Sequence, residues 1–420
     1  MPSTLDNIHH LVDHLFRRKA GQVIATLTRI FGVEHLDLAE DVTQEALLRA
    51  LRHWPYRGVP QNPGGWILQC ARNLAIDALR REASFRGKSE EIARQLEQEL
   101  RAEEEREAHA LQSDQLRLMF VCCHPELALE AQVALILKTL CGFSVEEIAR
   151  AFIATESTLA QRLVRAKRKL RELSVVCDLP EASALHARLD AVLAALYLLF
   201  NEGYNAHVGE DLIRADLCGE AIRLTMILVE HHLGNKPKVH ALLALMLLQA
   251  SRLPARTDDN GNLLVLAQQD RALWDQNLIQ RGLHHLQQAA RDEELSEYHV
   301  LAGIAMCHAT APDYEATNWK SILKFYDLLV TMNHSPVIAL NRAVALAKVE
   351  GMQSGIAALE KIRHLPPMKS YYLMPATLAE FHLRLGQREH AAACYQQALE
   401  LAGTEPERQF LMKKIAACTA

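Results

Sequence analysis

The sequence has few aromatic residues and few of the residues that interrupt helices. Phe, Trp and Tyr together make up 5% of its 420 residues, and it contains only 18 glycines and 14 prolines. Folds built from short strands need frequent turns, which are rich in glycine and proline. Half of the residues are hydrophobic, so the chain can bury real cores and is not a disordered protein. This composition predicts an all-α fold.

Long hydrophobic runs and an obvious disulfide framework are also missing. The longest wholly apolar run, Ala191–Phe200, is far shorter than the roughly 20 residues that cross a bilayer. The first residues do not combine a basic start with an apolar core, so we expect no secretory signal. The nine cysteines are an odd number scattered along the chain, as is typical of reduced thiols. We therefore expect a cytoplasmic protein with no membrane partner.

The chain lacks an overall positive charge. Lys and Arg number 46 against 51 Asp and Glu, and the net charge of −5 gives no general attraction to nucleic acid. Eight acidic residues and three arginines lie in Glu90–Glu107, which predicts a solvated helix or a flexible linker. Six basic residues and one acid lie in Ser157–Leu173. A local basic cluster of this kind is typical of a phosphate-binding surface.

One segment has the pattern of a helix-turn-helix. Ser144 and Glu147 have the spacing of a capping box, which predicts a helix over Val145–Phe152. Ile153–Thr155 then form the turn, and the side chain of Thr155 can cap the second helix.

The predicted second helix has one apolar face and one polar face. The apolar stripe, which we expect to pack inward, consists of Leu159, Leu163, Ala166 and Leu170. The other face carries Thr158, Gln161, Arg162, Arg165, Arg168 and Lys169. In this motif the second helix enters the major groove, where Arg and Gln match guanine and adenine edges and further basic residues meet phosphates. The alternative interpretation is a basic amphipathic helix that is merely solvated.

Two earlier segments carry weaker signals. Asp41, Gln44 and Glu45 occupy positions i, i+3 and i+4 and form one polar patch on a predicted helix. Trp66 precedes a helical stretch that carries Arg72, Asn73, Arg80 and Arg81, and aromatic and basic side chains together suit single-stranded DNA. Taken separately, the first is also compatible with a solvated helix face and the second with a core tryptophan.

In this order, over about residues 6–173, the three segments resemble a bacterial RNA polymerase sigma factor of the extracytoplasmic-function class. The resemblance implies that Asp41, Gln44 and Glu45 grip the coiled coil of the polymerase clamp. It implies that the minus-10 element is bound and opened by Trp66, Arg72, Asn73, Asp77, Arg80 and Arg81. It implies that the minus-35 element is read by Ser157, Thr158, Gln161, Arg162, Arg165, Arg168 and Lys169.

The chain departs from that class in two places. Arg57–Gly65 replaces the usual charged and aromatic approach to the tryptophan, so the preferred minus-10 base stays open. The chain also continues well beyond the second domain, as in the subgroup whose extension is tetratricopeptide-like. Gly351 and Gly386 each lie in a turn between two predicted helices. They are 35 residues apart, which is close to the tetratricopeptide period. An ordinary helical bundle is the alternative for this part.

The sequence therefore predicts four parts, which are a polymerase- and minus-10-binding domain (1–85), an acidic linker (86–110), a minus-35-binding domain (111–175) and a tetratricopeptide-like domain (176–420). We find no motif of a hydrolase, a phosphate-binding loop or a zinc protease, and we expect no catalytic residue, metal or cofactor. The expected partners are core RNA polymerase and promoter DNA. The C-terminal domain is expected to modulate activity through a protein partner or an intramolecular contact. The alternative function is a one-component helix-turn-helix regulator with a helical sensor or partner-binding domain.

Overall fold

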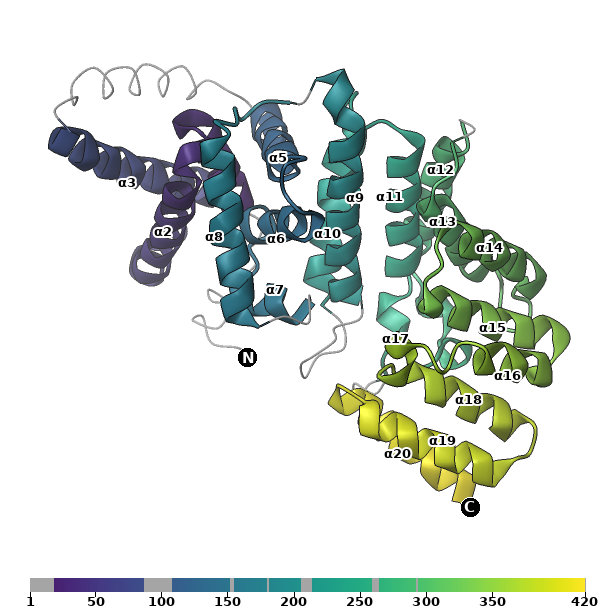
Figure 1. The fold of residues 1–420 in the computed structure, drawn as a ribbon. Helices are drawn as coiled ribbons and strands as arrows, with labels where there is room; N and C mark the ends of the chain where they lie inside the picture. The colour runs from purple at the N-terminus through teal and green to yellow at the C-terminus, as the bar shows by residue number, and fades with distance from the viewer. Residues whose placement is uncertain are drawn as a thin grey trace. The chain divides into compact units, whose positions relative to one another are not determined.

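The computed structural model describes residues 19–86, 108–151, 155–179, 181–204, 214–258, 264–291 and 294–419. Within these residues the regular structure is helical and contains no β-strand, so the predicted all-α fold is confirmed. The chain forms two compact units, one up to Leu199 and one from Phe200 onward (Figure 1). The predicted acidic linker, including all of Glu90–Glu107, falls almost entirely outside the described residues.

The first unit begins with four helical elements. A helix over residues 19–31 is followed by η1 (Val33–His35), α2 (Leu36–Arg57) and α3 (Pro63–Arg86). The α2 helix ends at Gly58, whose N–H donates to the Trp54 carbonyl over 2.9 Å. The side chain of Asn62 accepts a hydrogen bond from the Gly65 N–H at 2.9 Å, which caps the start of α3. The α2 and α3 helices pack against each other.

The rest of the first unit contains α5 (Ala108–Cys122), α6 (Leu129–Thr139), α7 (Val145–Ala151) and α8 (Glu156–Glu172). The α6 helix contacts the other three, and most of its residues are buried. Asp114 on α5 is 2% exposed and joins this group to the first helix. It accepts hydrogen bonds from Arg29 Nε at 2.6 Å and from Thr26 Oγ1 at 3.1 Å.

The α9 helix (Ala182–Tyr204) crosses the boundary between the two units. Its Arg188 Nη1 donates to the carbonyl of Phe120 in the first unit over 3.4 Å. An 18-residue stretch within Ala184–Tyr204 has a mean hydropathy of 1.3, and among the described helices this is the one span long and apolar enough to cross a membrane. Core helices of soluble proteins can be equally long and apolar, so this is weak evidence for a membrane span.

After the end of α9, the second unit contains α10 (Ala215–Glu230) and α11 (Pro237–Ala250), followed by the short η2 (Leu253–Ala255), η3 (Leu266–Gln268) and η4 (Arg271–Leu273). The helices α12 (Gln276–Ala289), α13 (Glu297–Ala309) and α14 (Trp319–Met332) come next. The α11 helix packs against α10, α12 and α13. Residues 241–248 of α11 are all buried, as their apolar run predicts.

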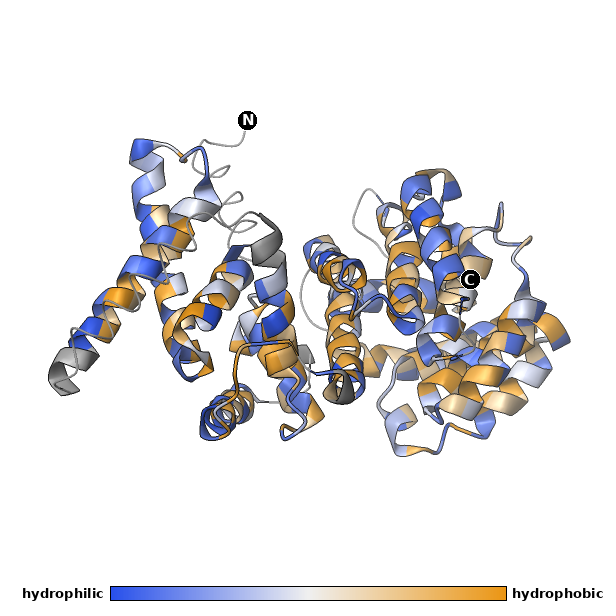
Figure 2. Cartoon of the chain, turned by 90° about the horizontal axis from the view of Figure 1, so that it is seen from above, coloured by the Kyte–Doolittle hydropathy of each residue, from blue (hydrophilic) through white to orange (hydrophobic). Residues whose placement is uncertain are grey.

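The unit ends with α15 (Pro336–Glu350), α16 (Met352–Glu360), α17 (Pro366–Lys369), α18 (Leu373–Arg384), α19 (Arg388–Leu401) and α20 (Glu405–Thr419). Most of these helices pack against the next one in the sequence, and Figure 1 shows them following one another in space. Hydrophobic residues gather on the faces that neighbouring helices cover, and hydrophilic ones lie on the outer faces (Figure 2). The core between α15, α16 and α18 includes Leu340, Leu359 and Phe381.

Two glycines end the first helix of their pairs. Gly351 joins α15 to α16 with φ 101°, and Gly386 lies between α18 and α19 with φ 76°. Residues with a side chain rarely adopt positive φ, so both turns require glycine. The two glycines that lie 35 residues apart in the sequence therefore form the same kind of backbone turn, each between the two helices of a pair.

We predict that Gly386→Ala lowers the free energy of unfolding by about 1–2 kcal/mol. A methyl group at this position would meet no atom within 4 Å, so the loss would come from the positive φ alone. Urea unfolding followed by circular dichroism measures it.

Gly219→Ala is the matched control, because Gly219 lies inside α10 and also has open space around it. There alanine should raise the stability, by up to about 1 kcal/mol, since it favours the helical backbone. Equal effects of the two substitutions would contradict the argument.

Candidate nucleic-acid and polymerase-binding surfaces

The polar patch predicted to bind polymerase lies on the outer face of α2. Asp41 and Gln44 are exposed, and the side chain of Glu45 is 42% exposed. The opposite face of the helix is buried through Val42, Ala46 and Leu47. The patch is thus held outward by the packing of its own helix.

Glu45 has a partner that the sequence analysis did not name. Its Oε1 accepts a hydrogen bond from Arg49 Nε at 3.0 Å, one turn further along α2. This bond raises the pKa of the Arg49 guanidinium. The i, i+4 spacing of Glu and Arg could have indicated the pair. Asp41 and Gln44 form no such contact with other described residues.

The residues predicted to act at the minus-10 element lie along α3. Asn73, Asp77, Arg80 and Arg81 are exposed, and Arg72 is half-buried. The buried side of this helix is made by Ile67, Ala71 and Ala75. The outward face therefore brings together most of the predicted residues on a single helix.

Hydrogen bonds along α3 link two of these side chains, Arg72 and Asn73, to Gln69. Gln69 Nε2 donates to Asn73 Oδ1 at 3.2 Å, and Gln69 Oε1 accepts from Arg72 Nη1 at 3.4 Å. Gln69 is not among the residues predicted from the sequence, although it lies four residues before Asn73 on the same helix face.

Trp66 is half-buried at the start of α3. Its ring meets that of Trp54 on α2 edge to face, with 5.6 Å between the ring centroids. Such aromatic pairs stabilise packing beyond the area that they bury. Trp66 therefore has a structural contact with α2 while part of its surface stays accessible.

The helix-turn-helix prediction is confirmed at both of its caps. The Ser144 N–H donates to Glu147 Oε2 at 2.8 Å, and the Glu147 N–H donates to Ser144 Oγ at 3.1 Å. The Thr155 side chain accepts from the Thr158 N–H at 3.2 Å and caps α8. Residues 152–154, which include most of the predicted turn, lie outside the described residues.

The α8 helix presents its polar residues as its apolar stripe predicts. All four stripe residues are at most 5% exposed, and they are Leu159, Leu163, Ala166 and Leu170. Gln161 and Arg165 are exposed, Arg162 is half-buried, and none of the three has a hydrogen bond or ion pair with another described residue. Their donors are therefore available to an external ligand.

Other polar residues of this face are already engaged. Ser157 and Thr158 are exposed, and each hydroxyl lies within hydrogen-bond distance of Thr155 Oγ1, at 3.1 and 2.8 Å. Arg168 Nε lies 3.5 Å from Glu172 Oε1, and Lys169 Nζ lies 3.7 Å from Glu126 Oε2. These two ion pairs are exposed, and such pairs contribute little to stability.

A hollow of about 340 Å³ lies beside this face. One wall consists of Thr158, Gln161, Arg162, Arg165 and Lys169 of α8, and the other comes from the start of α6 and the loop before it. The free donors of α8 therefore border a concave surface.

Two basic residues of α8 turn toward α2 instead. Lys167 Nζ lies 2.8 Å from Glu40 Oε2 and 2.9 Å from Asp37 Oδ1, and Arg171 lies 3.5 Å from Asp37. The side chains of Lys167 and Glu40 are only 11% and 9% exposed. Burial raises the pKa of Glu40, and burial lowers that of Lys167 less than its two acidic partners raise it. The basic residues of α8 are thus divided between a face that contacts α2 and a face that is open to solvent.

The adjacent cysteines of α5 and the turn after it are core residues. Cys122 and Cys123 are buried, and burial raises the pKa of the Cys122 thiol to about 12. A thiol with so high a pKa stays protonated at neutral pH and is a poor metal ligand. In the part of the chain that the structure describes, no group of His, Cys, Asp and Glu is arranged to hold a metal ion.

Known families match three parts of the chain. Sigma-70 region 2 matches residues 15–85, and sigma-70 region 4 matches residues 117–170. A family of unknown function (DUF6596) matches residues 188–290. An uncharacterized protein of Rhizobium meliloti (strain 1021) is 36% identical over 402 residues, which cover 94% of this chain and 92% of that protein.

The two sigma-70 regions define a class of DNA-binding proteins that act in transcription initiation. The chain belongs to the sigma-70 family, as a member of the extracytoplasmic-function type with a C-terminal extension. Sigma-70 regions 2 and 4 support a role in promoter-specific transcription initiation, as in sigma factors. They point to a transcription factor without enzymatic activity.

We predict that Lys167→Met lowers the free energy of unfolding by about 3–5 kcal/mol, because it leaves the buried Glu40 carboxylate without its ammonium partner. Adding Glu40→Gln should restore much of this loss, since no uncompensated buried charge remains. Urea unfolding of the three proteins measures both effects.

Arg168→Met is the matched control on the same helix, because the Arg168 side chain is 67% exposed. Its effect should stay within about 0.5 kcal/mol. A Lys167→Met protein as stable as the control would show that the buried pair contributes nothing.

Proposed function

We propose that this protein is a sigma factor that binds core RNA polymerase, directs it to promoters and helps to open the minus-10 region. The observation that carries the proposal is that both sigma-70 regions occur in one chain, with the expected contact residues on outward helix faces. Bond formation then belongs to the polymerase, and the sigma factor supplies recognition.

The α2 patch is the proposed contact with the polymerase. Asp41 and Gln44 are exposed and have no partner among the described residues, so they reach a second protein without breaking a contact. The outward face of α3 is the proposed contact with the minus-10 strand. Trp66 is only half-buried there, and the exposed Arg80 and Arg81 offer positive charge for phosphates.

The outward face of α8 is the proposed reader of the minus-35 element. Arg165 and Gln161 carry the groups that guanine and adenine edges bind in the major groove. Arg168 and Lys169 follow along the helix, where their positive charge favours backbone phosphates. The exposed ion pairs of these two residues are weak enough for DNA to replace them.

The remaining parts of the proposal concern the organisation of the chain. Residues 1–85 and 111–175 act as the two promoter-binding domains, joined by an acidic linker over residues 86–110. Residues 176–420 act as a helical domain that modulates this activity through a protein partner or an intramolecular contact. The protein works in the cytoplasm, where its polymerase and promoters are.

Transcription in vitro tests the function. We predict that the full-length protein, added to purified core polymerase and genomic DNA of its own organism, produces transcripts from a defined set of start sites. Glu45→Lys should reduce their yield about tenfold or more, because it reverses the charge of the polymerase patch. Its unfolding free energy should change by only about 0.5 kcal/mol, since the residue lies on the surface.

Arg49→Gln is the control for Glu45→Lys, because it breaks the same ion pair and leaves the carboxylate in place. This variant should keep near-normal transcription. Specific DNA binding without any promoter-dependent transcription would favour a one-component regulator and contradict the proposed function.

Binding to promoter DNA tests the α8 surface. We predict that Arg165→Ala weakens binding by about 1–3 kcal/mol if the guanidinium binds a guanine, with relaxed preference at that position. If it binds a phosphate, affinity should fall evenly across sequences and its salt dependence should become shallower.

Arg171→Ala removes the same charge from the same helix but at a residue that faces Asp37, and it serves as the control. Electrophoretic mobility shifts at several salt concentrations measure both variants. Unchanged affinity of the Arg165→Ala protein would exclude docking of this helix face in the groove.

A further inference from the structure

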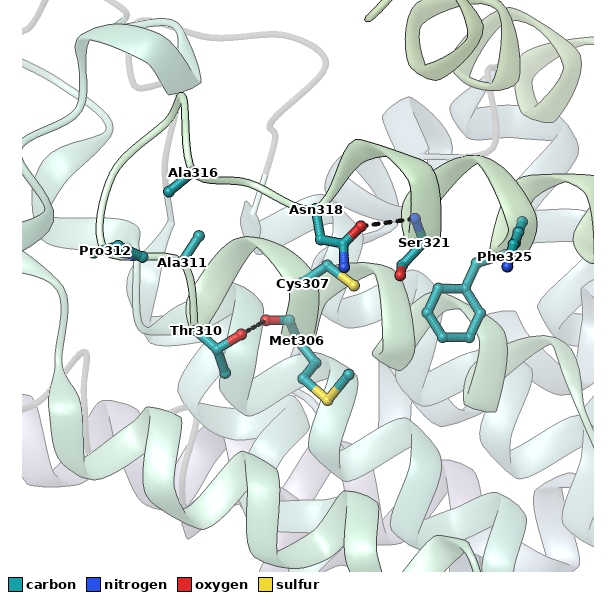
Figure 3. A pocket seen from close by; sticks show the side chains of 10 residues that line it. Met306, Cys307, Thr310, Ala311, Pro312, Ala316, Asn318, Ser321 and Phe325 are labelled. Carbon is teal, nitrogen blue, oxygen red and sulfur yellow. Dashed lines mark hydrogen bonds between the residues drawn. The ribbon is translucent and has the colours of Figure 1, made fainter. Parts of the chain in front are cut away.

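Two hollows of the second unit differ in what they offer a ligand. The first, of about 480 Å³, lies between α13 and α14 (Figure 3). Two of its polar side chains are engaged within the chain, since Asn318 accepts from the Ser321 N–H at 3.0 Å and Thr310 donates to the Met306 carbonyl at 2.9 Å. Lys324 is the one charged side chain in its lining, and Phe325 is the one aromatic residue.

The second cavity, of about 390 Å³, is lined by several helices that are far apart in the sequence. Residues of η3 and of α13, α14, α15, α16, α18, α19 and α20 contribute to it, between Val265 and Lys414. The cavity thus spans successive helix pairs. Inner surfaces of this kind are where stacked helical repeats commonly bind their partners.

The cavity has an excess of positive charge. Its lining contains the cations Lys348, Arg384 and Lys414 and one carboxylate, Glu380. Arg384 Nε donates to one oxygen of Glu380 at 2.9 Å, and Lys414 Nζ and the Tyr395 hydroxyl donate to the other, each at 3.0 Å. These bonds lower the pKa of Glu380, although its burial works in the opposite direction. The single negative charge is therefore shared between two cations.

Lys348 is the cation without an acidic partner. Its Nζ lies 4.5 Å from the ring centre of Tyr314 and 5.4 Å from that of Trp319, and the structure gives it no ion pair among the described residues. Aromatic rings hold an ammonium group in place without neutralising it. Lys348 is thus fixed at the cavity wall with its charge available to an anion.

The remaining wall is aromatic and apolar, with Trp319, Tyr326, Phe381 and Phe410 among its residues. His308 also lines it, and burial lowers the pKa of this imidazole to about 4, so it is neutral at physiological pH. Its Nδ1 is buried and has no hydrogen-bond partner among the described residues.

Asn341 on α15 adds a polar group of a different kind. Its amide is exposed, lines the same cavity and has no partner among the described residues. A side-chain amide both donates and accepts, as a peptide backbone requires. A chain segment is therefore a better match to this surface than a ligand that carries acceptors alone.

We propose that this cavity binds a segment of a protein partner in which an Asp or Glu lies next to an aromatic or aliphatic residue. The carboxylate pairs with Lys348, the apolar side chain packs on the aromatic wall, and Asn341 bonds to the backbone. The proposal concerns the second unit alone, so it can succeed or fail independently of the proposed role in transcription.

Selection from a phage-displayed library of random linear peptides on the immobilised full-length protein tests this. The selected sequences should be enriched in Asp or Glu beside Phe, Trp, Leu or Ile. A selected peptide with a fluorescent label should bind the Lys348→Met protein at least about tenfold more weakly than it binds the wild type. Added salt should weaken its binding to the wild type. Selection on the Lys348→Glu protein should lose the acidic preference.

Lys361→Met is the matched control, because Lys361 is exposed at the end of α16 and does not line the cavity. It should bind the peptide as the wild type does, and urea unfolding should show that all variants are folded. Failure to enrich any sequence, sequences without acidic residues, or equal binding by the Lys348→Met and wild-type proteins would overturn the proposal. If N-acetyltryptophan displaced the peptide and bound with an affinity equal to that of the peptide, the proposal would be overturned in favour of a small-molecule site.

Discussion

Narrow apolar stripes on amphipathic helices determine where the functional side chains of this protein point. In α8 a stripe from Leu159 to Leu170 is buried against neighbouring helices, and this packing turns Gln161 and Arg165 outward. The same holds for α2, where Ala46 is fully buried one residue away from the half-exposed Glu45. Because successive residues of a helix turn by about 100°, a shift of one residue in the packing would bury part of each surface.

Charged contacts then connect helices that are distant in the sequence. Asp114 is almost fully buried and accepts hydrogen bonds from two side chains of the first helix, which links that helix to α5. Glu40 and Lys167 link α2 to α8 in the same unit. A buried charge is strongly unfavourable alone, so each contact favours one relative placement of its helices. Asp41 and Gln44 on α2, and Gln161 and Arg165 on α8, remain exposed beside these contacts.

Local sequence patterns predicted much of this structure. The caps of the helix-turn-helix and the apolar stripe of α8 depend on residues within a few positions of one another, and both predictions are confirmed. The spacing of Gly351 and Gly386 likewise indicated two similar helix pairs, because each glycine meets a local backbone requirement.

Contacts between distant residues could not be predicted in this way. Lys167 looked like one more member of a phosphate-binding cluster, but its partner Glu40 lies 127 residues away. The neutralisation of Glu380 by Lys414, 34 residues further on, and the free charge of Lys348 also depend on how helices stack. The roles of the α2, α3 and α8 residues stay predictions, since their outward positions are compatible with those roles without demonstrating them.

The repeated glycine turn has a consequence for how this part of the chain can change in length. Gly351 and Gly386 end equivalent helices, and each helix pair makes its main contacts with the adjoining helices. Gain or loss of a whole pair would keep every remaining stripe facing a neighbour, whereas gain or loss of one residue inside a helix would rotate everything after it. Among relatives, length differences in this region should therefore occur as whole helix pairs or within the turns that join them.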